Sequence, residues 1–332
     1  MTWSAIRGQR MAVDLLRRAV AGGRVAHAYL FAGPAGVGKR LAAVQLARSL
    51  NCLDPRAGEP CGSCRSCRKL AADPPVHPDV MLVEPDGRMI RTEQMRQVQN
   101  EVYARPTEGR FKVVILDGVE RMTPESGNRL LKVLEEPPAY ACFVLLTTNV
   151  AGVLPTIVSR CQIVHFSPLP PEEVAAVLQE KAGIGPEEAR LYASLSGGSV
   201  GAALAMARSP EVARRRDEAL GLLLRLGEMD DADLLEQAGE WEKEKEHLEE
   251  RLDMAALWLR DALLVARGAP ERLVVNADRM ADVRALADRC GPSGLMAMLE
   301  SLAGARDALL RNANARLVLD VLLLDLASAV RS

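Results

Sequence analysis

The first half of the chain alternates short, continuous apolar runs with segments of helical periodicity. The apolar runs lie at 28–32, 80–83, 113–116, 143–147 and 163–166. Because they lack alternation with polar residues, they are typical of parallel strands that are buried on both faces of a sheet. Helical spacing of apolar positions is found at 10–21, 39–50, 92–103 and 124–136. Strands that alternate with helices predict an α/β domain built on a parallel sheet.

Beyond residue 167 the pattern predicts helices. The sequence SPLPP at 167–171 ends the last predicted strand, and a Ser-Pro pair at 209–210 marks a second boundary. Three short helical segments lie between these boundaries, and longer amphipathic helices follow them. We therefore expect three parts, which are an α/β domain over 1–167, a small three-helix domain over 168–208 and an all-α domain over 209–332.

Composition narrows the kinds of function that this fold can carry. The 332 residues are 48% hydrophobic and 3% aromatic, which suits a helix-rich soluble protein of two or three domains. A net charge of −2 excludes a global basic field for nucleic acid, so any DNA contact would be local or supplied by a partner. The N-terminus lacks an apolar targeting segment, and the most apolar late stretch contains Asp320 and Asp325. We expect a cytoplasmic protein without membrane contact.

The sequence GPAGVGKR at 33–40 follows the first predicted strand and opens a predicted helix. In that context G-x-x-x-x-G-K is typical of a phosphate-binding loop, whose backbone N–H groups surround an anion. The candidate nucleotide-binding residues of the loop are Gly33, Gly36, Gly38, Lys39 and Arg40. Lys39 would reach the β- and γ-phosphates of a nucleotide. The alternative interpretation is a glycine-rich turn that binds nothing.

Two further features bear on catalysis. Arg40 stands where such loops carry a Ser or Thr whose hydroxyl binds Mg²⁺, and it adds a positive charge where the metal would lie. Asp117 ends a predicted strand, as the metal-orienting residue of an NTPase should, but Gly118 follows it in place of a water-activating Glu. Glu120 is nearby, and we expect it to point elsewhere if a turn or helix starts there. The pattern leaves ATP or ADP binding open and argues against hydrolysis.

Four of the seven cysteines fall between positions 52 and 67. They are Cys52, Cys61, Cys64 and Cys67. Four thiolates at this spacing predict a tetrahedral zinc site with bonds of about 2.3 Å, and the lack of a nearby acid–base pair makes it structural rather than catalytic. An iron–sulfur cluster and reduced surface thiols are the alternatives. The remaining chemically active candidates are expected to be packing or turn residues, namely Cys142, Cys161, Cys290 and His77.

Several fragments recur together in one known family. They are IRGQ at 6–9, HAYLF at 27–31, the cysteine insertion, NRLLKVLEEPP at 128–138, TTN at 147–149 and SRC at 159–161. In these fragments the chain resembles the AAA+ clamp-loader ATPases of bacterial DNA polymerase III. The resemblance covers nearly all of 1–207, whereas the last third resembles the helical collar of that family only in its general pattern.

This resemblance implies a fold and a set of partners. The fold would be an AAA+ domain with a zinc insertion, a helical lid and an all-α collar through which subunits assemble. Asn149 falls at the sensor 1 position, and Arg160 falls at the arginine finger, which reaches the ATP of a neighbouring subunit. Without the resemblance, a lone Arg is usually a surface ion pair. The implied partners are the motor and delta subunits and, through the complex, the sliding clamp and primed DNA. The whole assembly is a DNA-directed DNA polymerase, a nucleotidyltransferase.

Departures from the family pattern indicate the kind of subunit. Motor subunits carry GK[ST], an Asp-Glu pair and an Arg in a lid helix, where this chain has Arg40, Gly118 and Gly201. These losses beside a retained Ser-Arg-Cys resemble the delta' class, a scaffold without activity of its own that donates its finger to a neighbouring ATPase. The alternative is an ATP-hydrolysing motor subunit in which Glu120 or a water replaces the missing groups. A zinc-stabilised AAA+-like scaffold outside replication is a third hypothesis.

Overall fold

The protein forms two compact units. The structure, a computed structural model, describes residues 2–72, 74–87, 89–244, 247–311 and 313–331. The first unit comprises Met1–Val174 with Gly197–Ala202, and the second comprises Ala175–Ser196 with Ala203–Ser332. The segment expected to form a separate three-helix domain is shared between these units, so the division into three domains stays a prediction.

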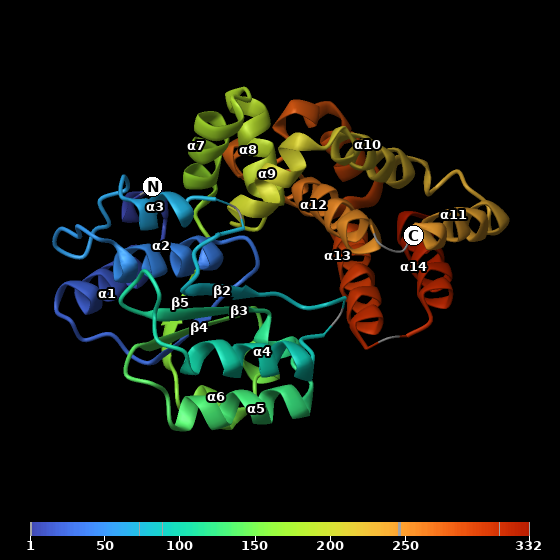
Figure 1. Ribbon diagram of the computed structural model, residues 1–332. Helices are drawn as coiled ribbons and strands as arrows, with labels where there is room; N and C mark the ends of the chain where they lie inside the picture. The colour runs from blue at the N-terminus through green and yellow to red at the C-terminus, as the bar shows by residue number, and fades with distance from the viewer. Residues whose placement is uncertain (1, 73, 88, 245–246, 312, 332) are drawn as a thin grey trace. The chain divides into compact units, whose positions relative to one another are not determined.

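A five-stranded sheet forms the centre of the first unit (Figure 1). Its strands are β1 (Ala28–Ala32), β2 (Val80–Val83), β3 (Lys112–Asp117), β4 (Ala141–Thr147) and β5 (Gln162–His165). Their spatial order is β2-β3-β4-β1-β5, and every neighbouring pair is parallel, which confirms the predicted α/β sheet. All residues of β1 and β4 are buried, as their apolar runs predicted.

The prediction of burial on both faces was wrong for β5. Gln162, Ile163 and His165 are exposed, and Val164 alone is buried. The reason is position, because β5 pairs with β1 on one side only and forms an edge of the sheet. The other edge strand, β2, is also only partly buried.

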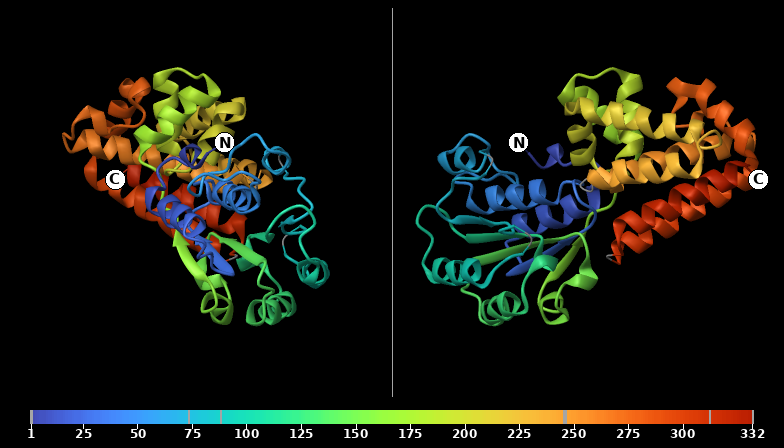
Figure 2. Two further views of the ribbon diagram at one scale, coloured as in Figure 1. Left: turned by 60° about the vertical axis from the view of Figure 1, so that its left-hand side comes forward. Right: turned by 90° about the vertical axis from the view of Figure 1, so that its right-hand side faces the viewer.

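Helices cover both faces of this sheet (Figures 1 and 2). One face carries α1 (Arg10–Ala21) and α2 (Lys39–Asn51), and the other carries α4 (Thr92–Tyr103), α5 (Pro124–Glu135) and α6 (Pro155–Val158). Leu30 of β1 and Phe143 of β4 share one buried cluster with Met95 of α4 and Leu130 of α5. Removal of this apolar surface from water holds the helices on the sheet. The short helices are η1 (Trp3–Ala5), α3 (Arg65–Lys69), η2 (Val119–Arg121) and η3 (Val150–Gly152).

The second unit is built from helices. They are α8 (Pro186–Leu195), α10 (Pro210–Arg225), α11 (Asp231–Lys243), α12 (Leu248–Ala266), η5 (Glu271–Leu273), η6 (Ala277–Arg279), α13 (Met280–Leu310) and α14 (Ala315–Arg331). The helices α7 (Pro171–Ala182) and α9 (Val200–Arg208) cross the division between the units. α13 is interrupted at Gly291, whose φ is +59°, and Pro292 follows without an N–H to donate. Within the described residues, no helix combines the length and apolar character needed to cross a membrane.

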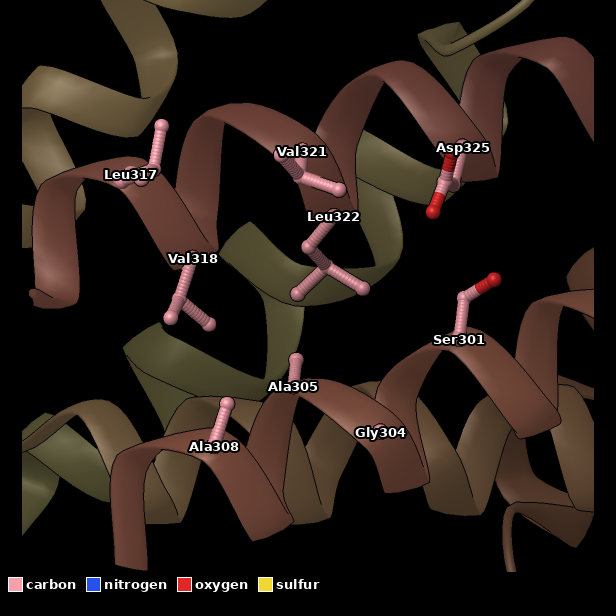
Figure 3. Close-up of a pocket in the computed structure, with 9 residues that line it drawn as sticks. All are labelled: Ser301, Gly304, Ala305, Ala308, Leu317, Val318, Val321, Leu322 and Asp325. Carbon is pink, nitrogen blue, oxygen red and sulfur yellow. The ribbon is translucent and has the colours of Figure 1, made fainter. Parts of the chain in front are cut away.

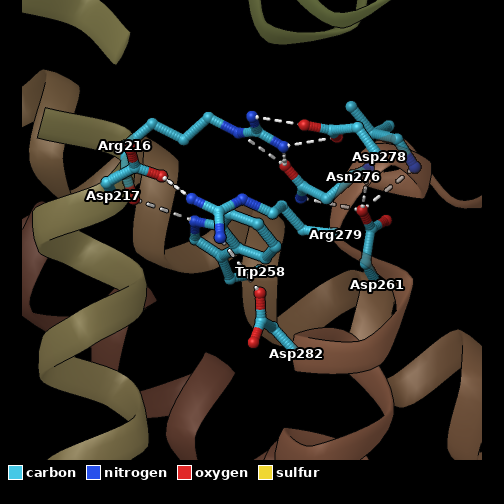
Figure 4. A network of polar contacts seen from close by, with 9 residues as sticks. Arg216, Asp217, Trp258, Asp261, Asn276, Asp278, Arg279 and Asp282 are labelled. Carbon is cyan, nitrogen blue, oxygen red and sulfur yellow. Dashed lines mark hydrogen bonds and ion pairs between the residues drawn. The ribbon is translucent and has the colours of Figure 1, made fainter. Parts of the chain in front are cut away.

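A buried polar network fixes the turn between α12 and α13 (Figure 4). The Arg216 guanidinium lies 4.9 Å from the ring centroid of Trp258 and donates to the Asn276 side chain and to Asp278. Asp261, which is fully buried, accepts from the backbone N–H and the side-chain amide of Asn276. Burial raises the pKa of Asp261, and these hydrogen bonds lower it in part. The network ties α10 and α12 to the segment that enters α13.

An apolar groove lies between α13 and α14 (Figure 3). Its volume is about 310 Å³, and its lining includes Gly304 and Ala308 of α13 with Leu317 and Val321 of α14. Asp325 provides a carboxylate at one end of the groove. Leu317 is 63% exposed and Val321 is 50% exposed, so α14 presents large apolar side chains to solvent.

Candidate nucleotide site and metal centre

The glycine loop joins β1 to α2, in the order that a phosphate-binding loop requires. Gly33 N–H donates to the Thr147 carbonyl at 3.2 Å, which fixes the start of the loop to β4. Gly36 and Gly38 have φ values of +70° and +103°, and Gly38 is the N-cap of α2. Such backbone conformations favour glycine, so the spacing of the motif matches the shape of the loop.

Lys39 is buried and folded onto its own loop. Its Nζ donates to the carbonyls of Gly33 and Pro34, both at 2.6 Å. Burial lowers the pKa of Lys39, while the carboxylates of Asp117 and Glu120 raise it in part. Two of the three donors of the ammonium are therefore held by the chain itself, where a nucleotide-binding lysine would reach phosphates.

Arg40 forms an ion pair with Glu84, which follows β2. This places a guanidinium and a carboxylate beside Asp117 at the end of β3. Burial raises the pKa of Asp117, and the positive charges of Arg40 and Lys39 lower it in part. Charges of both signs thus neutralise one another at the position where an NTPase holds Mg²⁺.

Glu120 lies close enough to affect the charges of Lys39 and Asp117, but its carboxylate is bonded to Thr148. Its Oε1 accepts hydrogen bonds from Thr148 N–H at 3.2 Å and from Thr148 Oγ1 at 2.7 Å. Burial raises the pKa of Glu120, but the hydrogen bonds from Thr148 and Thr147 outweigh it and leave the pKa below its usual value. The turn at Gly118, with φ +77°, carries η2 back toward the end of β4. The glycine was the only sequence signal for this placement.

Asn149 follows β4 at the same edge of the sheet. Its side-chain oxygen accepts from Ala151 N–H at 3.1 Å and caps η3. The amide oxygen is therefore engaged in a local turn, and the sensor role of Asn149 stays a prediction.

The start of α9 packs directly on the glycine loop. Gly201 N–H donates to the Gly36 carbonyl at 3.0 Å, and Ser199 Oγ accepts from Ala202 N–H. A Cβ atom at Gly36 would lie only 2.2 Å from Ser199 Oγ. Residues 197–202 therefore belong to the same compact unit as the loop. The sequence pattern alone did not predict this contact.

Gln9 connects the loop to the exit of β5. Its Nε2 donates to the carbonyls of Ser167 at 2.7 Å and Val37 at 3.3 Å, and its Oε1 accepts from Ser167 N–H. The side chain is buried, so these bonds replace those that it would make with water. The segment at 6–9 thus has a structural function beside the loop.

Arg160 follows α6 and folds back on it. Its Nη1 donates to the Thr156 carbonyl at 3.0 Å, and its Nη2 donates to Glu135 Oε1 at 2.8 Å. The Arg160 side chain is 36% exposed and that of Glu135 is 49% exposed. Both terminal nitrogens of the guanidinium are engaged within this chain, at its surface.

The four predicted zinc ligands come together. The sulfur atoms of Cys52, Cys61, Cys64 and Cys67 all lie within 4.8 Å of one another. A tetrahedral Zn–S₄ site with bonds of about 2.3 Å separates its sulfurs by about 3.8 Å, so the donor set fits zinc. Backbone N–H groups donate to three of these sulfurs, as from Cys61 to Cys52 at 3.2 Å. Such bonds stabilise thiolates and hold the loop in shape.

The environments of the thiols differ. Hydrogen bonds from the backbone N–H groups of Cys64 and Ser63 lower the pKa of Cys61 to about 6, whereas burial raises the pKa of Cys67 to about 12. Cys142 and Cys161 lie outside the cluster, and burial raises the pKa of each to about 12. These two thiols fit the predicted packing roles. His77 is buried, and its Nδ1 accepts from Asp79 N–H at 3.1 Å, as a turn residue does.

Comparison with known proteins identifies the family. A family model described as DNA polymerase III, delta subunit, matches residues 8–170, and a second, described as DNA polymerase III, delta subunit, C terminal, matches residues 214–328. The DNA polymerase III subunit delta' of Bacillus subtilis (strain 168) is 36% identical over 269 residues, which are 80% of this chain and 80% of that protein. This chain belongs to the delta' family of DNA polymerase III clamp-loader subunits. The fold class is confirmed as an α/β domain with a parallel sheet, followed by helices.

More distant similarities extend to other subunits. The DNA polymerase III subunit gamma/tau of Mycobacterium tuberculosis (strain ATCC 25618 / H37Rv) is 37% identical over 177 residues. These residues are 53% of this chain but only 30% of that protein. Among solved structures, a DNA polymerase III gamma subunit-related protein of Thermotoga maritima is 21% identical, with a TM-score of 0.43 over 96% of this chain and 99% of that chain. The delta' family membership does not depend on these similarities.

Proposed function

We propose that this delta' family member is a non-hydrolysing scaffold of the clamp loader. It would donate Arg160 to the ATP site of a neighbouring motor subunit while the complex places the sliding clamp on primed DNA. The delta subunit and the gamma or tau motor subunits would be its direct partners, in the cytoplasm where chromosomal DNA is copied. The observation that carries this proposal is the charge pattern of the glycine loop, in which the Arg40–Glu84 ion pair stands in place of a Mg²⁺-binding hydroxyl.

The lack of a hydroxyl at position 40 should impair ATP hydrolysis more than it impairs nucleotide binding. Phosphoryl transfer depends on a metal that bridges the β- and γ-phosphates and neutralises the developing charge. The Arg40 guanidinium offers no oxygen ligand to a divalent cation, and it holds the nearby Glu84 carboxylate in an ion pair. The replacement of the water-activating Glu by Gly118 removes a second requirement of the same reaction.

The contacts that the glycine loop makes within the protein support the same conclusion. Lys39 is held by the Gly33 and Pro34 carbonyls, and the Gly36 carbonyl accepts from Gly201. A nucleotide would have to draw Lys39 Nζ away from the two carbonyls before the ammonium could reach its phosphates, whereas the Gly36 contact engages a carbonyl and fixes the loop to the start of α9. We therefore propose that the loop acts mainly as a structural element, which joins the sheet to residues 199–202 within the same unit.

Steady-state ATP turnover by the isolated chain tests this proposal. With Mg²⁺-ATP and primed DNA, the isolated chain should hydrolyse no ATP above the background of an Arg40→Ala, Lys39→Ala double variant. Robust turnover by the unaltered chain would contradict the proposal. Binding of labelled ATP with and without Mg²⁺ would then separate a loop that binds nothing from one that binds nucleotide without its metal.

One observation favours the alternative of an active motor subunit. Glu120 lies at the site, and its carboxylate acts on the charge of Lys39. In principle this carboxylate could replace the missing water-activating Glu. Its Oε1 is already engaged by both donors of Thr148, so we rank this function second.

We propose that the helical unit carries the surface through which this chain assembles with other subunits. The groove between α13 and α14 is apolar, and it is flanked by exposed Leu317 and Val321 (Figure 3). Exposed apolar surface of this kind marks contacts with other proteins. We propose that a helix of another clamp-loader subunit occupies it, with a basic side chain placed near Asp325.

The cysteine cluster is proposed to hold one structural zinc ion. Cys52, Cys61, Cys64 and Cys67 would be the four ligands, and the metal would join the end of α2 to α3. Four protein ligands leave no open position for a reacting water, which fits a structural rather than a catalytic metal.

A further inference from the structure

The surroundings of Arg160 suggest a control on its proposed use. Its Nη1 is bound by the Thr156 carbonyl of its own helix, and its Nη2 by the Glu135 carboxylate at the end of α5. A guanidinium recognises a phosphate with the same paired N–H groups that recognise a carboxylate. Glu135 therefore occupies part of the edge that a γ-phosphate would use.

We propose that Glu135 is a latch on Arg160, which holds the guanidinium within this chain until a phosphate of a neighbouring subunit displaces it. This inference rests on the proposed function of Arg160 as a finger in trans. The Glu135 carboxylate and the neighbour's phosphate compete for the Arg160 guanidinium. The fraction of Arg160 bound to phosphate therefore depends on the strength of both interactions. Release of the latch is a local side-chain rotation, because both groups lie at the surface.

The Arg160–Glu135 ion pair is weak because both side chains are partly exposed, and this limits how much its loss can change ATP turnover. An ion pair between groups that are 36% and 49% exposed is screened by water and salt. Its loss should change the engaged fraction of the finger by about two- to five-fold. Because the finger acts on the transition state, the change belongs in kcat, with the KM for ATP nearly constant.

Glu135→Gln is the variant that tests the latch. It keeps the shape and an acceptor oxygen but removes the charge that competes with phosphate. Glu136→Gln is the matched control, because it removes the same charge one residue later, and among the described residues Glu136 forms no ion pair. Both are exposed positions at the end of α5, so neither substitution should affect folding.

The experiment measures DNA-stimulated ATP turnover of the reconstituted clamp loader at low salt. Glu135→Gln should raise kcat about two- to five-fold, Glu136→Gln should leave it unchanged, and the gain should shrink as salt is added. In an Arg160→Ala background, Glu135→Gln should have no effect. An unchanged or lowered kcat for Glu135→Gln, while Arg160→Ala slows the complex, would overturn the latch and leave the finger intact. A complex that Arg160→Ala does not slow would instead overturn the proposed function.

Discussion

The Asp79 carboxylate is a buried anchor that the sequence pattern did not single out. It accepts from the backbone N–H groups of Thr107, Glu108 and Gly109 at 2.7 Å each, and its Oδ1 lies 3.1 Å from Lys112 Nζ. Burial raises the pKa of Asp79, but these donors outweigh it and hold the pKa at about 2, below the usual 3.8. The charged form is therefore stabilised in the folded state, by about 2.5 kcal/mol.

This carboxylate predicts a pH dependence of stability. The folded-state pKa lies below the unfolded one, so the contribution is present above pH 4 and is lost as the pH falls toward 2. Asp79→Asn should lower the free energy of unfolding by about 3 kcal/mol at pH 7, because Lys112 is left buried with only its longer, 3.9 Å ion pair to the exposed Glu101. In urea titrations between pH 3 and pH 7, the difference between variant and parent should narrow toward pH 3. A difference that is constant with pH would contradict this assignment.

The cysteine cluster makes a second prediction at the scale of residues. The purified chain should contain about one zinc ion, and Cys64→Ser should lose it and lower the melting temperature, since the metal replaces a hydrophobic core for this small loop. Cys290→Ser, outside the cluster, is the control and should keep the metal. Elemental analysis that finds no zinc in the parent, or equal zinc in Cys64→Ser, would count against the site.

At the scale of elements, the glycine loop packs against residues 199–202 at the start of α9, within the first unit. Gly36→Ala adds a methyl group 2.2 Å from Ser199 Oγ at a φ of +70°, whereas Gly23→Ala has a similar φ of +63° with open space around it. Both should pay about 1–2 kcal/mol for backbone strain, and Gly36→Ala should lose a further 1–3 kcal/mol from overpacking. Chemical denaturation compares them. Equal losses for both variants would mean that α9 does not pack on the loop.

Elements that depend on the pattern of nearby residues could be predicted from the sequence, whereas features that depend on contacts between distant segments could not. The limits of α1 and α4 and of β1 follow from periodicity and agree with the structure to the residue. The exposure of β5 could not be predicted, because an apolar run such as that around Ile163 does not reveal whether its strand lies at an edge. Likewise, the positions of Glu120 and Gly201 at the loop depend on contacts across long sequence separations. The cysteine ligands could be predicted because their spacing alone brings them together.

At the scale of the whole molecule, assembly should depend on the helical unit. Val321→Glu places a charge in the groove between α13 and α14, which should weaken binding to the other clamp-loader subunits at least ten-fold, since a buried unpaired charge is costly. Leu273→Glu is the control, because Leu273 is a similarly exposed apolar residue outside the groove. Pull-down or analytical ultracentrifugation measures both. Equal affinities for parent and Val321→Glu would exclude the groove as an assembly surface.

The central claim is that this chain assists hydrolysis in a neighbour and performs none itself. The most direct measurement is steady-state ATP turnover of the clamp loader reconstituted with Arg160→Ala, with assembly verified by gel filtration. The adjoining site should slow by about 1,000-fold, so the complex loses the share of turnover that this site supplies. Arg160→Lys should restore little, because an ammonium cannot form the paired contacts of a guanidinium. An intact complex with unchanged turnover would contradict the account.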